Sequence, residues 1–203
     1  SGQPFSELDF FKKRLGQTES LLGIKQRQID SLLEITRAVN SNMPITALAR
    51  IYENILRAQM GVTQAALFIR DKYNGCVCIT SAEVSPAVLN YDAIEKFGKL
   101  NFITPVAALQ DPTLEGFEYL IPVLHNKEPI GTALIGTFGS DQTDTKEEKL
   151  KFIQTITNII VVANENKKLV KTQIDQMVMQ KELKLAADMQ NMLVPSNLPN
   201  HEA

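Results

Sequence analysis

The side chains best suited to nucleophilic or metal chemistry in this sequence of 203 residues are Cys76, Cys78, His125 and His201. The two cysteines alternate along an apolar run, so on a strand they would share one face, where a disulfide between them is unfavourable. Neither cysteine has a histidine close by, and the pair alone falls short of a zinc site. Neither histidine has a positioned partner for acid–base catalysis. We therefore expect small buried thiols in a reducing compartment and solvent-exposed histidines.

Three glycines and two carboxylates also fit structural roles better than chemical ones. Gly131, Gly136 and Gly139 lack the strand, glycine-rich turn and helix of a phosphate-binding loop, so we expect tight packing or bulges in a strand. Glu147 and Glu148 suit the first turn of a helix, where the helix dipole favours negative charge. The sequence thus predicts no catalytic residue, no metal ligand and no cofactor in this chain.

Composition narrows the class of protein further. The formal net charge is −2 and there is no basic block, which argues against a nucleic-acid partner because such a partner needs a concentrated positive face. The apolar run over 159–163 is far shorter than the roughly 20 residues that span a bilayer. No secretory signal is visible. We expect a cytoplasmic protein with no membrane insertion.

A long helix is predicted over 5–39, where apolar residues recur every seven positions, as in a coiled coil. Its seam consists of Leu8, Leu15, Leu22 and Ile29, with Phe11, Leu32 and Val39 at companion positions. Such a stripe needs a partner: the helix either packs on the domain or pairs with its twin in a dimer. After Pro44 a second helix runs to Met60 and ends at Gly61.

The middle of the chain predicts two β-hairpins. The first joins strands over 64–70 and 76–80 through Asn74-Gly75, a strong hairpin signal. The second joins 117–125 and 129–138 around residues 126–128, with Pro122 predicting an edge position or a bulge. Between the hairpins we expect one short helix over 85–100, begun by Ser85-Pro86, and a weak strand within 101–109.

The final helix is predicted from about residue 145 to 194, capped by Thr143 or Thr145. Ile153, Ile156, Ile160 and Ala163 should cover the core, and three further residues should continue the seam: Val170, Ile174 and Met177. The apolar phase then slips near 177–181. A second register takes over, consisting of Leu183, Ala186, Gln190 and Leu193. Such a slip alters the winding of a coiled coil, and it is either a functional joint or a fray point.

Residues 28–163 together resemble a GAF domain. The resemblance is carried by IDSLLEITRAVNSNM before the second helix, by AALFIRD followed by NG, and by YLIPVLHNKEPIGTALIG. It implies an α+β fold: an antiparallel sheet with helices packed on one face, flanked here by long N- and C-terminal helices. The expected organisation is a coiled-coil helix over 1–39, a sensor domain over 40–163, a signalling helix over 164–194, and the start of a missing output domain over 195–203.

The same resemblance implies a cup-shaped domain that can hold a small molecule. If a pocket exists, plausible linings are Phe68, Thr80, Phe102, Tyr119 and Thr132; otherwise these side chains belong to the core. The cyclic-nucleotide signature of the family cannot be placed in order, and neither cysteine has the neighbouring histidine of the bilin-binding members.

The C-terminal residues resemble the motif that opens bacterial SpoIIE-type serine phosphatases, which regulate sigma factors. The matching residues are Glu182, Leu183, Ala186, Met189, Gln190, Leu193, Pro195, Leu198 and Pro199. Met189 replaces the usual Ile, and Val194 the usual second Leu. The resemblance implies that the helix joins a sensor to a phosphatase domain beyond Ala203, where Mn or Mg would bind.

The sequence therefore predicts a regulatory sensor that dimerises through its long helices and relays a signal to a downstream phosphatase domain. One alternative is an oligomerisation scaffold without a ligand. Another is the sensor of a histidine kinase or a diguanylate cyclase. Identity of the ligand, parallel or antiparallel pairing of the helices, and the sign of regulation stay open.

Overall fold

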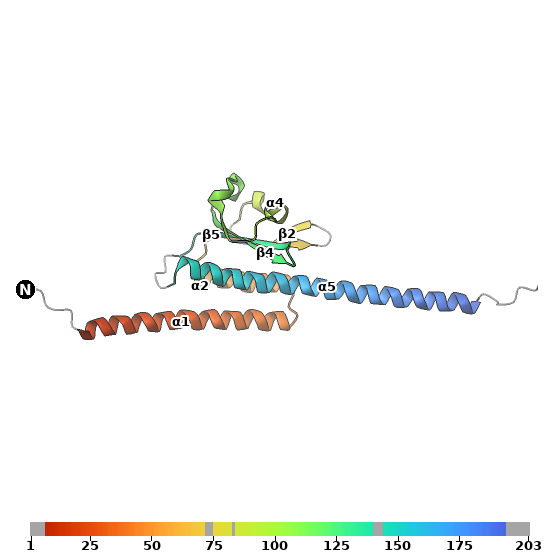
Figure 1. The fold of residues 1–203 in the computed structure, drawn as a ribbon, viewed down its shortest axis with the longest axis horizontal. Helices are drawn as coiled ribbons and strands as arrows, with labels where there is room; N and C mark the ends of the chain where they lie inside the picture. Colours follow the sequence, from red (N-terminus) through yellow and green to blue (C-terminus); the bar gives the residue numbers. More distant parts are fainter. Residues whose placement is uncertain (1–6, 72–74, 83, 140–143, 194–203) are drawn as a thin grey trace, which may run out of the picture. The chain divides into compact units, whose positions relative to one another are not determined.

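The computed structural model describes residues 7–71, 75–82, 84–139 and 144–193. The chain divides into two units, Ser1–Asn164 and Glu165–Ala203. The first unit holds a β-sheet, the short helices and the beginning of the long last helix (Figure 1). It also includes the N-terminal helix, for which the sequence predicts a separate coiled-coil segment over 1–39. The described part of the second unit, residues 165–193, is helical throughout.

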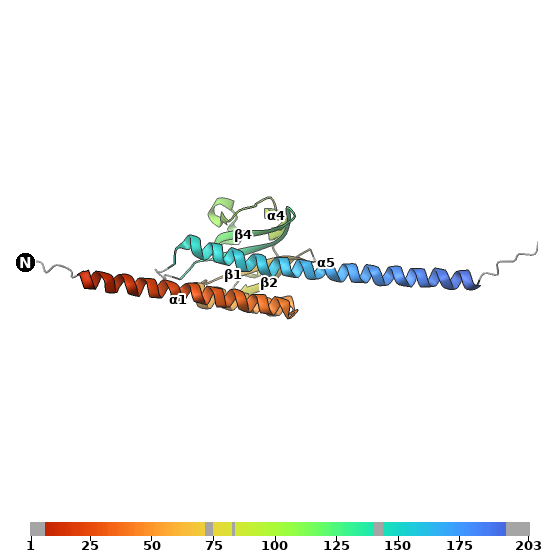
Figure 2. The same ribbon diagram turned by 60° about the horizontal axis from the view of Figure 1, so that its bottom comes forward.

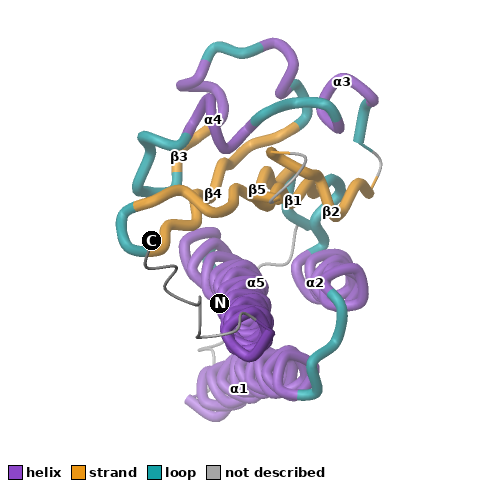
Figure 3. Tube along the Cα trace, turned by 90° about the vertical axis from the view of Figure 1, so that its right-hand side faces the viewer, coloured by secondary structure: helices purple, strands orange, loops and turns teal. Residues whose placement is uncertain are grey.

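The first unit is built on a five-stranded antiparallel sheet with the strand order β2-β1-β5-β4-β3. Its strands are β1 (Ala65–Asp71), β2 (Gly75–Ala82), β3 (Thr104–Pro105), β4 (Phe117–His125) and β5 (Glu128–Gly136). Seen along the helices, the sheet lies between two layers of helices (Figure 3). Both predicted hairpins are present, β1–β2 and β4–β5.

Local residue chemistry explains the β4–β5 hairpin. Asn126 and Lys127 both have positive φ angles, 51° and 69°, which is the geometry of a tight two-residue turn. The Asn74 turn of the other hairpin lies outside the described residues. Pro122 is tolerated in β4 because β3 pairs only with Tyr119 and Leu120, so the other edge of β4 needs no donor at residue 122. The predicted edge position therefore holds only locally, because β4 lies between β5 and β3 in the sheet.

Strand β1 is buried on both faces, and its side chains alternate between two apolar clusters. Ala65, Leu67 and Ile69 belong to the cluster on the side of the long helices. Ala66 and Phe68 belong to the cluster on the opposite side. This two-residue period is that of a strand, and it explains why β1 has a continuous apolar run rather than a polar alternation.

Helix α2 (Ile45–Met60) and the first part of α5 (Lys146–Leu193) cover one face of the sheet, and α1 (Glu7–Asn40) packs on these helices from the side that faces away from the sheet (Figure 3). Figure 2 shows α1 running alongside the first part of α5, and α1 also contacts α2. Helix α2 ends as predicted at Gly61, whose φ of 63° is left-handed. Between α2 and α5, the buried Tyr52 hydroxyl donates to Thr157 Oγ1 at 2.8 Å, because the Thr157 hydroxyl itself donates to the Ile153 carbonyl.

Helix α5 approaches β5 so closely that only glycine fits at residue 131. A Cβ atom there would lie 2.7 Å from Val161 Cγ1 and 3.0 Å from the Phe68 carbonyl oxygen. Ile153, Ile156 and Ile160 fill the core beside this contact. The expected tight packing of Gly131 is confirmed, as is the covering role of the three isoleucines.

The other face carries four short elements: α3 (Pro86–Leu89), α4 (Ala93–Phe97) and the 3-10 helices η1 (Val106–Leu109) and η2 (Pro112–Leu114). The prediction of one helix over 85–100 is wrong. Asp92 begins a new helix, because its side chain accepts the Glu95 backbone N–H at 2.9 Å. The weak strand predicted within 101–109 is only β3, since the chain turns into η1 after Pro105.

Helix α1 packs on the domain by a different stripe from the predicted seam. The stripe facing the domain consists of Ile24, Gln28, Ser31, Ile35 and Ala38. The seam residues Leu8, Leu15, Leu22 and Ile29 are all at least 50% exposed. The expectation of a single apolar stripe is therefore wrong. The second stripe was not recognised in the sequence because it includes the polar residues Gln28 and Ser31. Gln28 donates to Asp144, and Gln59 of α2 donates to Ser31 Oγ at 2.5 Å.

The second unit leaves its apolar side chains exposed, among them Val170, Ile174, Met177, Leu183 and Leu193. The helix continues without a break through the phase slip at 177–181. In the described part of the chain, no helix combines the length and the apolar character needed to cross a membrane.

Candidate functional site

A cavity of about 480 Å³ lies between the end of the β1–β2 hairpin and α4. It is lined by Arg70, Asp71, Gly75, Cys76, Asp92, Ile94 and Glu95. A second cavity of about 350 Å³ shares Asp92 and Glu95 with it and is completed by Tyr91 and Lys96. The charged lining suits a polar ligand, since an apolar molecule there would take charged groups out of water.

A polar network holds the segment before α4 in place beside these cavities. Lys96 Nζ donates to Asp111 Oδ2 at 2.5 Å, and the Tyr91 hydroxyl donates to the same oxygen. The Thr113 backbone N–H donates to the other carboxylate oxygen at 3.0 Å. Together these donors, Lys96 foremost, hold the pKa of Asp111 well below its usual range. Lys96 also lies 4.9 Å from the centre of the Tyr91 ring.

The cysteines have the geometry of packing residues. Both lie half-buried on β2, against the apolar cluster of that face. Burial raises the pKa of both thiols, that of Cys78 to about 11. Because the thiolate is the nucleophilic form, both groups are poor nucleophiles at neutral pH. His125 ends β4 and is partly exposed, whereas His201 lies outside the described residues.

The predicted lining residues do not gather around this cavity. Phe68 and Thr132 face each other across β1 and β5, fully buried on the side of α4. Tyr119 packs with Phe138 beside the long helices, and Phe102 is 61% exposed. The buried Thr80 hydroxyl has no hydrogen-bond partner among the described residues. Whether any of the five contacts a ligand stays a prediction.

A sequence signal for the observed lining exists but is faint. Asp92 and Glu95 form an acidic helix start, in which the first residue caps the helix. Nothing in the sequence shows that this helix start lies next to Arg70, Asp71 and Cys76, because that proximity comes from the path between the sheet and α4.

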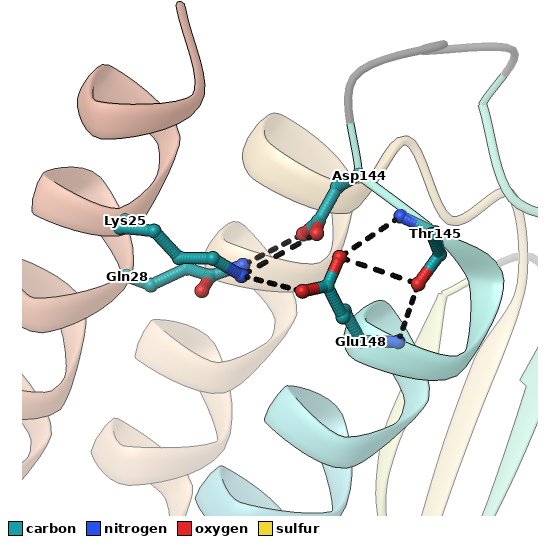
Figure 4. A network of polar contacts seen from close by, with 5 residues as sticks. All are labelled: Lys25, Gln28, Asp144, Thr145 and Glu148. Atoms are coloured by element: carbon teal, nitrogen blue, oxygen red, sulfur yellow. Dashed lines mark hydrogen bonds and ion pairs between the residues drawn. The ribbon is translucent and has the colours of Figure 1, made fainter. Parts of the chain in front are cut away.

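A second polar site joins α1 to the start of α5 (Figure 4). Lys25 Nζ lies 3.4 Å from Asp144 Oδ1 and 3.5 Å from Glu148 Oε1. Gln28 Nε2 donates to Asp144 Oδ2 at 2.9 Å. Thr145 and Glu148 form a capping box, since each accepts the other's backbone N–H at 3.2 Å. The Thr145 cap is thus confirmed, whereas Thr143 lies outside the described residues.

The two carboxylates of this site have different proton affinities. Burial raises the pKa of Asp144, although the positive charge of the nearby Lys25 acts in the opposite direction. The hydrogen bond with Asp144, followed by the Thr145 backbone N–H, lowers the pKa of Glu148 to about 2. Lys25 and the side-chain amide of Gln28 bind this pair of carboxylates. The site therefore connects α1 to the start of α5 and is not an acid–base pair facing a cavity. Among the described residues, no three histidine, cysteine or acidic side chains come together as a metal site would require.

Comparison with known proteins identifies the fold. No family model and no curated protein matches the sequence. Solved structures do match. The GAF domain of a protein described as a sensor histidine kinase from Pseudomonas syringae pv. tomato has 12% sequence identity and a TM-score of 0.54, covering 81% of this chain and 99% of that one.

Two further matches are GAF domains of phosphoenolpyruvate-protein phosphotransferases. The domain from Acinetobacter has 16% identity and a TM-score of 0.53, and the one from Coxiella burnetii has 17% and 0.54. Each covers 71% of this chain and 96% of its own. The first unit therefore has the GAF fold, and the predicted fold class is confirmed: an antiparallel sheet with helices, flanked by the long helices α1 and α5.

Proposed function

We propose that this chain is a cytoplasmic regulatory sensor and dimerisation module of signal transduction. The observation that carries the proposal is the exposed apolar surface of both long helices. Leu8, Leu15, Leu22 and Ile29 on α1 and Val170, Ile174 and Met177 on α5 repeat at coiled-coil spacing, yet are 50–64% exposed. An apolar stripe of that length favours association, and the second copy is the natural partner for a helix of identical period.

Light scattering on the full chain tests the dimer directly. At tens of micromolar we expect the mass of two chains, because both stripes would be buried in the dimer. Replacing Leu15 and Leu22 by Ser should lower the mass toward one chain, with the matched change of exposed Ser20 to Ala as a control. A monomer of the unaltered chain would contradict the proposal.

The sensing part of the proposal rests on the GAF fold and on the cavity beside α4. A small polar molecule there would contact the β1–β2 hairpin and α4 together, so binding could bias their arrangement. A ligand specific to the native state stabilises it by mass action, by about 2.7 kcal/mol when the free ligand concentration is a hundred times Kd, and so raises the melting temperature. A screen of small polar metabolites should therefore find one that stabilises the chain, and a substitution such as Asp92→Ala should abolish that gain.

One observation favours the alternative of a scaffold without a ligand. The space between the sheet and α3 and α4 is filled by an apolar cluster that includes Phe68, Leu114 and Leu120. The remaining cavity lies beside α4, with a charged lining. If no compound changes the melting temperature while the dimer persists, the scaffold is the better description.

The output we propose is a metal-dependent serine/threonine phosphatase domain in cis, which would bind Mn or Mg. Support comes from the sequence resemblance of Glu182 to Pro199, of which residues 194–199 lie outside the described part. Sequencing the reading frame beyond Ala203 tests this. Spaced aspartates able to bind two metal ions support the phosphatase, whereas a kinase or cyclase pattern would overturn it.

The phase slip of α5 gives a test of the relay. Lys181, Lys184 and Asp188 occupy the positions at which the first apolar register would continue past Met177. Changing all three to Leu should make one continuous seam and lock the output of the longer protein in a single state. A locked variant that still responds to its signal would contradict a relay through this joint.

A further inference from the structure

A small polar cavity lies between α1, α2 and the start of α5, apart from the two cavities beside α4. Its volume is about 20 Å³, and a single water molecule needs about 10–15 Å³ of such space. Ile24 and Met60 form apolar walls, while Gln28, Gln59 and Lys149 bring polar groups from the three helices. The cavity is therefore large enough, and polar enough, for one small polar molecule.

Two polar groups at this cavity have hydrogen-bonding capacity that the described residues leave unused. Gln59 Nε2 donates to Ser31 Oγ, but the buried Gln59 Oε1 accepts no hydrogen bond from any described residue. Lys149 is only 4% exposed, and in the described part of the chain its ammonium group donates only to the Gly139 carbonyl oxygen, at 3.4 Å. An ammonium group carries three donors. Because burying polar groups without partners is costly, both groups call for a further partner.

We propose that the cavity binds one water molecule, which accepts from Lys149 and donates to Gln59 Oε1 and to the Asp144 carboxylate. Asp144 lines the cavity and is 8% exposed. Its oxygens accept from Lys25 and Gln28, and a carboxylate offers about four acceptor positions, so it can also accept from the water. The water joins α5 to α2 directly, and it joins both to α1 through Asp144, which faces Gln28 in Figure 4.

The lining of the cavity favours a neutral molecule over an ion. A metal cation has no lone pair with which to accept from Lys149, and it would lie near a second cationic side chain, that of Arg27. A simple anion such as chloride has no hydrogen to donate to Gln59 Oε1, and it would lie near the Asp144 carboxylate. Water both accepts and donates, so it meets both demands. The site depends neither on the dimer of the proposed function nor on a ligand beside α4.

A high-resolution crystal structure of the full chain tests the site directly. We expect one electron-density peak within about 3.2 Å of Lys149 Nζ, of Gln59 Oε1 and of one Asp144 carboxylate oxygen. Gln59→Met should lose the peak, because methionine has a similar length but only a weak acceptor. Gln26→Met makes the same change at an exposed residue of α1 and should keep it. An unaltered chain without the peak, or with Lys149 bonded directly to Gln59, overturns the proposal.

Soaking the same crystals in sodium bromide separates water from an anion at this peak. Bromide scatters X-rays anomalously, so a bound bromide is identified by its anomalous signal. A peak that shows no anomalous signal after the soak supports water. Bromide in the cavity would identify an anion site and overturn the proposal.

Magnetic relaxation dispersion of the water signal gives a second readout, in solution and without crystals. It counts the water molecules that stay bound to the protein far longer than surface water does. We expect Gln59→Met to show one long-lived water fewer than the unaltered chain, and Gln26→Met to show the same number. Equal numbers for Gln59→Met and the unaltered chain would overturn the proposal. Circular dichroism shows whether each variant is folded, and the peak in the unaltered chain decides the matter if Gln59→Met is not.

Discussion

The two parts of α5 have similar side chains but opposite environments. Over residues 146–164, Ile153, Ile156 and Ile160 are fully buried against the sheet and α2. Over residues 165–193, Ile174 and Met177 continue the same spacing, yet each is more than half exposed. Apolar spacing therefore shows that a helix face needs a cover, but does not show whether the same chain supplies it.

Helix α1 extends this lesson to two faces of a single element. Its covered face includes polar Gln28 and Ser31, which are satisfied by Asp144 and Gln59. Its uncovered face has the more regular apolar repeat, starting from Leu8. The more regular pattern is thus the one left exposed, which is typical of a surface that binds a separate helix of the same period.

The largest expected effect comes from truncating one isoleucine in each part of α5. Ile156→Ala should destabilise the domain by about 3 kcal/mol, because it removes buried atoms and leaves a cavity. Ile174→Ala should change the unfolding free energy of the domain by less than about 0.5 kcal/mol, because that side chain is solvated in the monomer. Urea unfolding at low protein concentration measures both. Equal losses would mean that residue 174 is covered within the same chain.

A second comparison sets two glycines against each other. Gly131→Ala should cost about 1–3 kcal/mol, because the new methyl group would lie 2.7 Å from Val161 Cγ1. Gly16→Ala on α1 should stabilise by up to about 1 kcal/mol, because no atom lies within 4 Å and alanine favours the helix. Thermal melts of both variants give the two signs. Adding Val161→Ala should recover part of the loss at residue 131, and no recovery would place the strain elsewhere.

Much of the fold could be predicted because its signals are local. Gly61 ends α2 through its left-handed backbone, and Asn126-Lys127 forms a tight turn, both set by a few neighbouring residues. The break between α3 and α4 was missed because it depends on whether Asp92 caps a new helix or lies within an old one. Both arrangements are compatible with the apolar spacing of 85–100.

The candidate site could be predicted far less well, because its residues meet only through the tertiary path. Of the five predicted lining residues, Phe68 and Thr132 lie opposite each other across β1 and β5. Tyr119 and Phe102 lie elsewhere, because the sequence does not show which face or edge of the sheet these two residues occupy. Asp71 and Asp92, which line the cavity, are separated by the whole of β2 and α3, and no periodicity links them.

Removing one hydroxyl at a time tests how the covered part of α5 is bound to α2. Thr157→Val should cost more than Tyr52→Phe, about 1–3 against about 0.5–1.5 kcal/mol. The valine leaves the buried Tyr52 hydroxyl without an acceptor, whereas the phenylalanine leaves Thr157 still donating to the Ile153 carbonyl. Chemical denaturation measures both. If the phenylalanine variant is the less stable one, the Tyr52 hydroxyl is not the donor to Thr157.

The smallest effect is electrostatic and distinguishes a bound carboxylate from a solvated one. The pKa of Asp111 is lowered in the folded state by Lys96, Tyr91 and the Thr113 N–H. The unfolded chain therefore binds a proton at Asp111 at a higher pH than the folded chain does, so this contribution is present above about pH 4 and is lost on acidification below it. Asp111→Asn should accordingly be less stable than the unaltered chain at pH 6, with the gap narrowing toward pH 3. Asp175→Asn, on the exposed part of α5, makes the same change of charge and serves as the control in pH-dependent urea unfolding. An Asp111→Asn gap that stays constant from pH 6 to 3 would mean that the carboxylate is not bound through its charge.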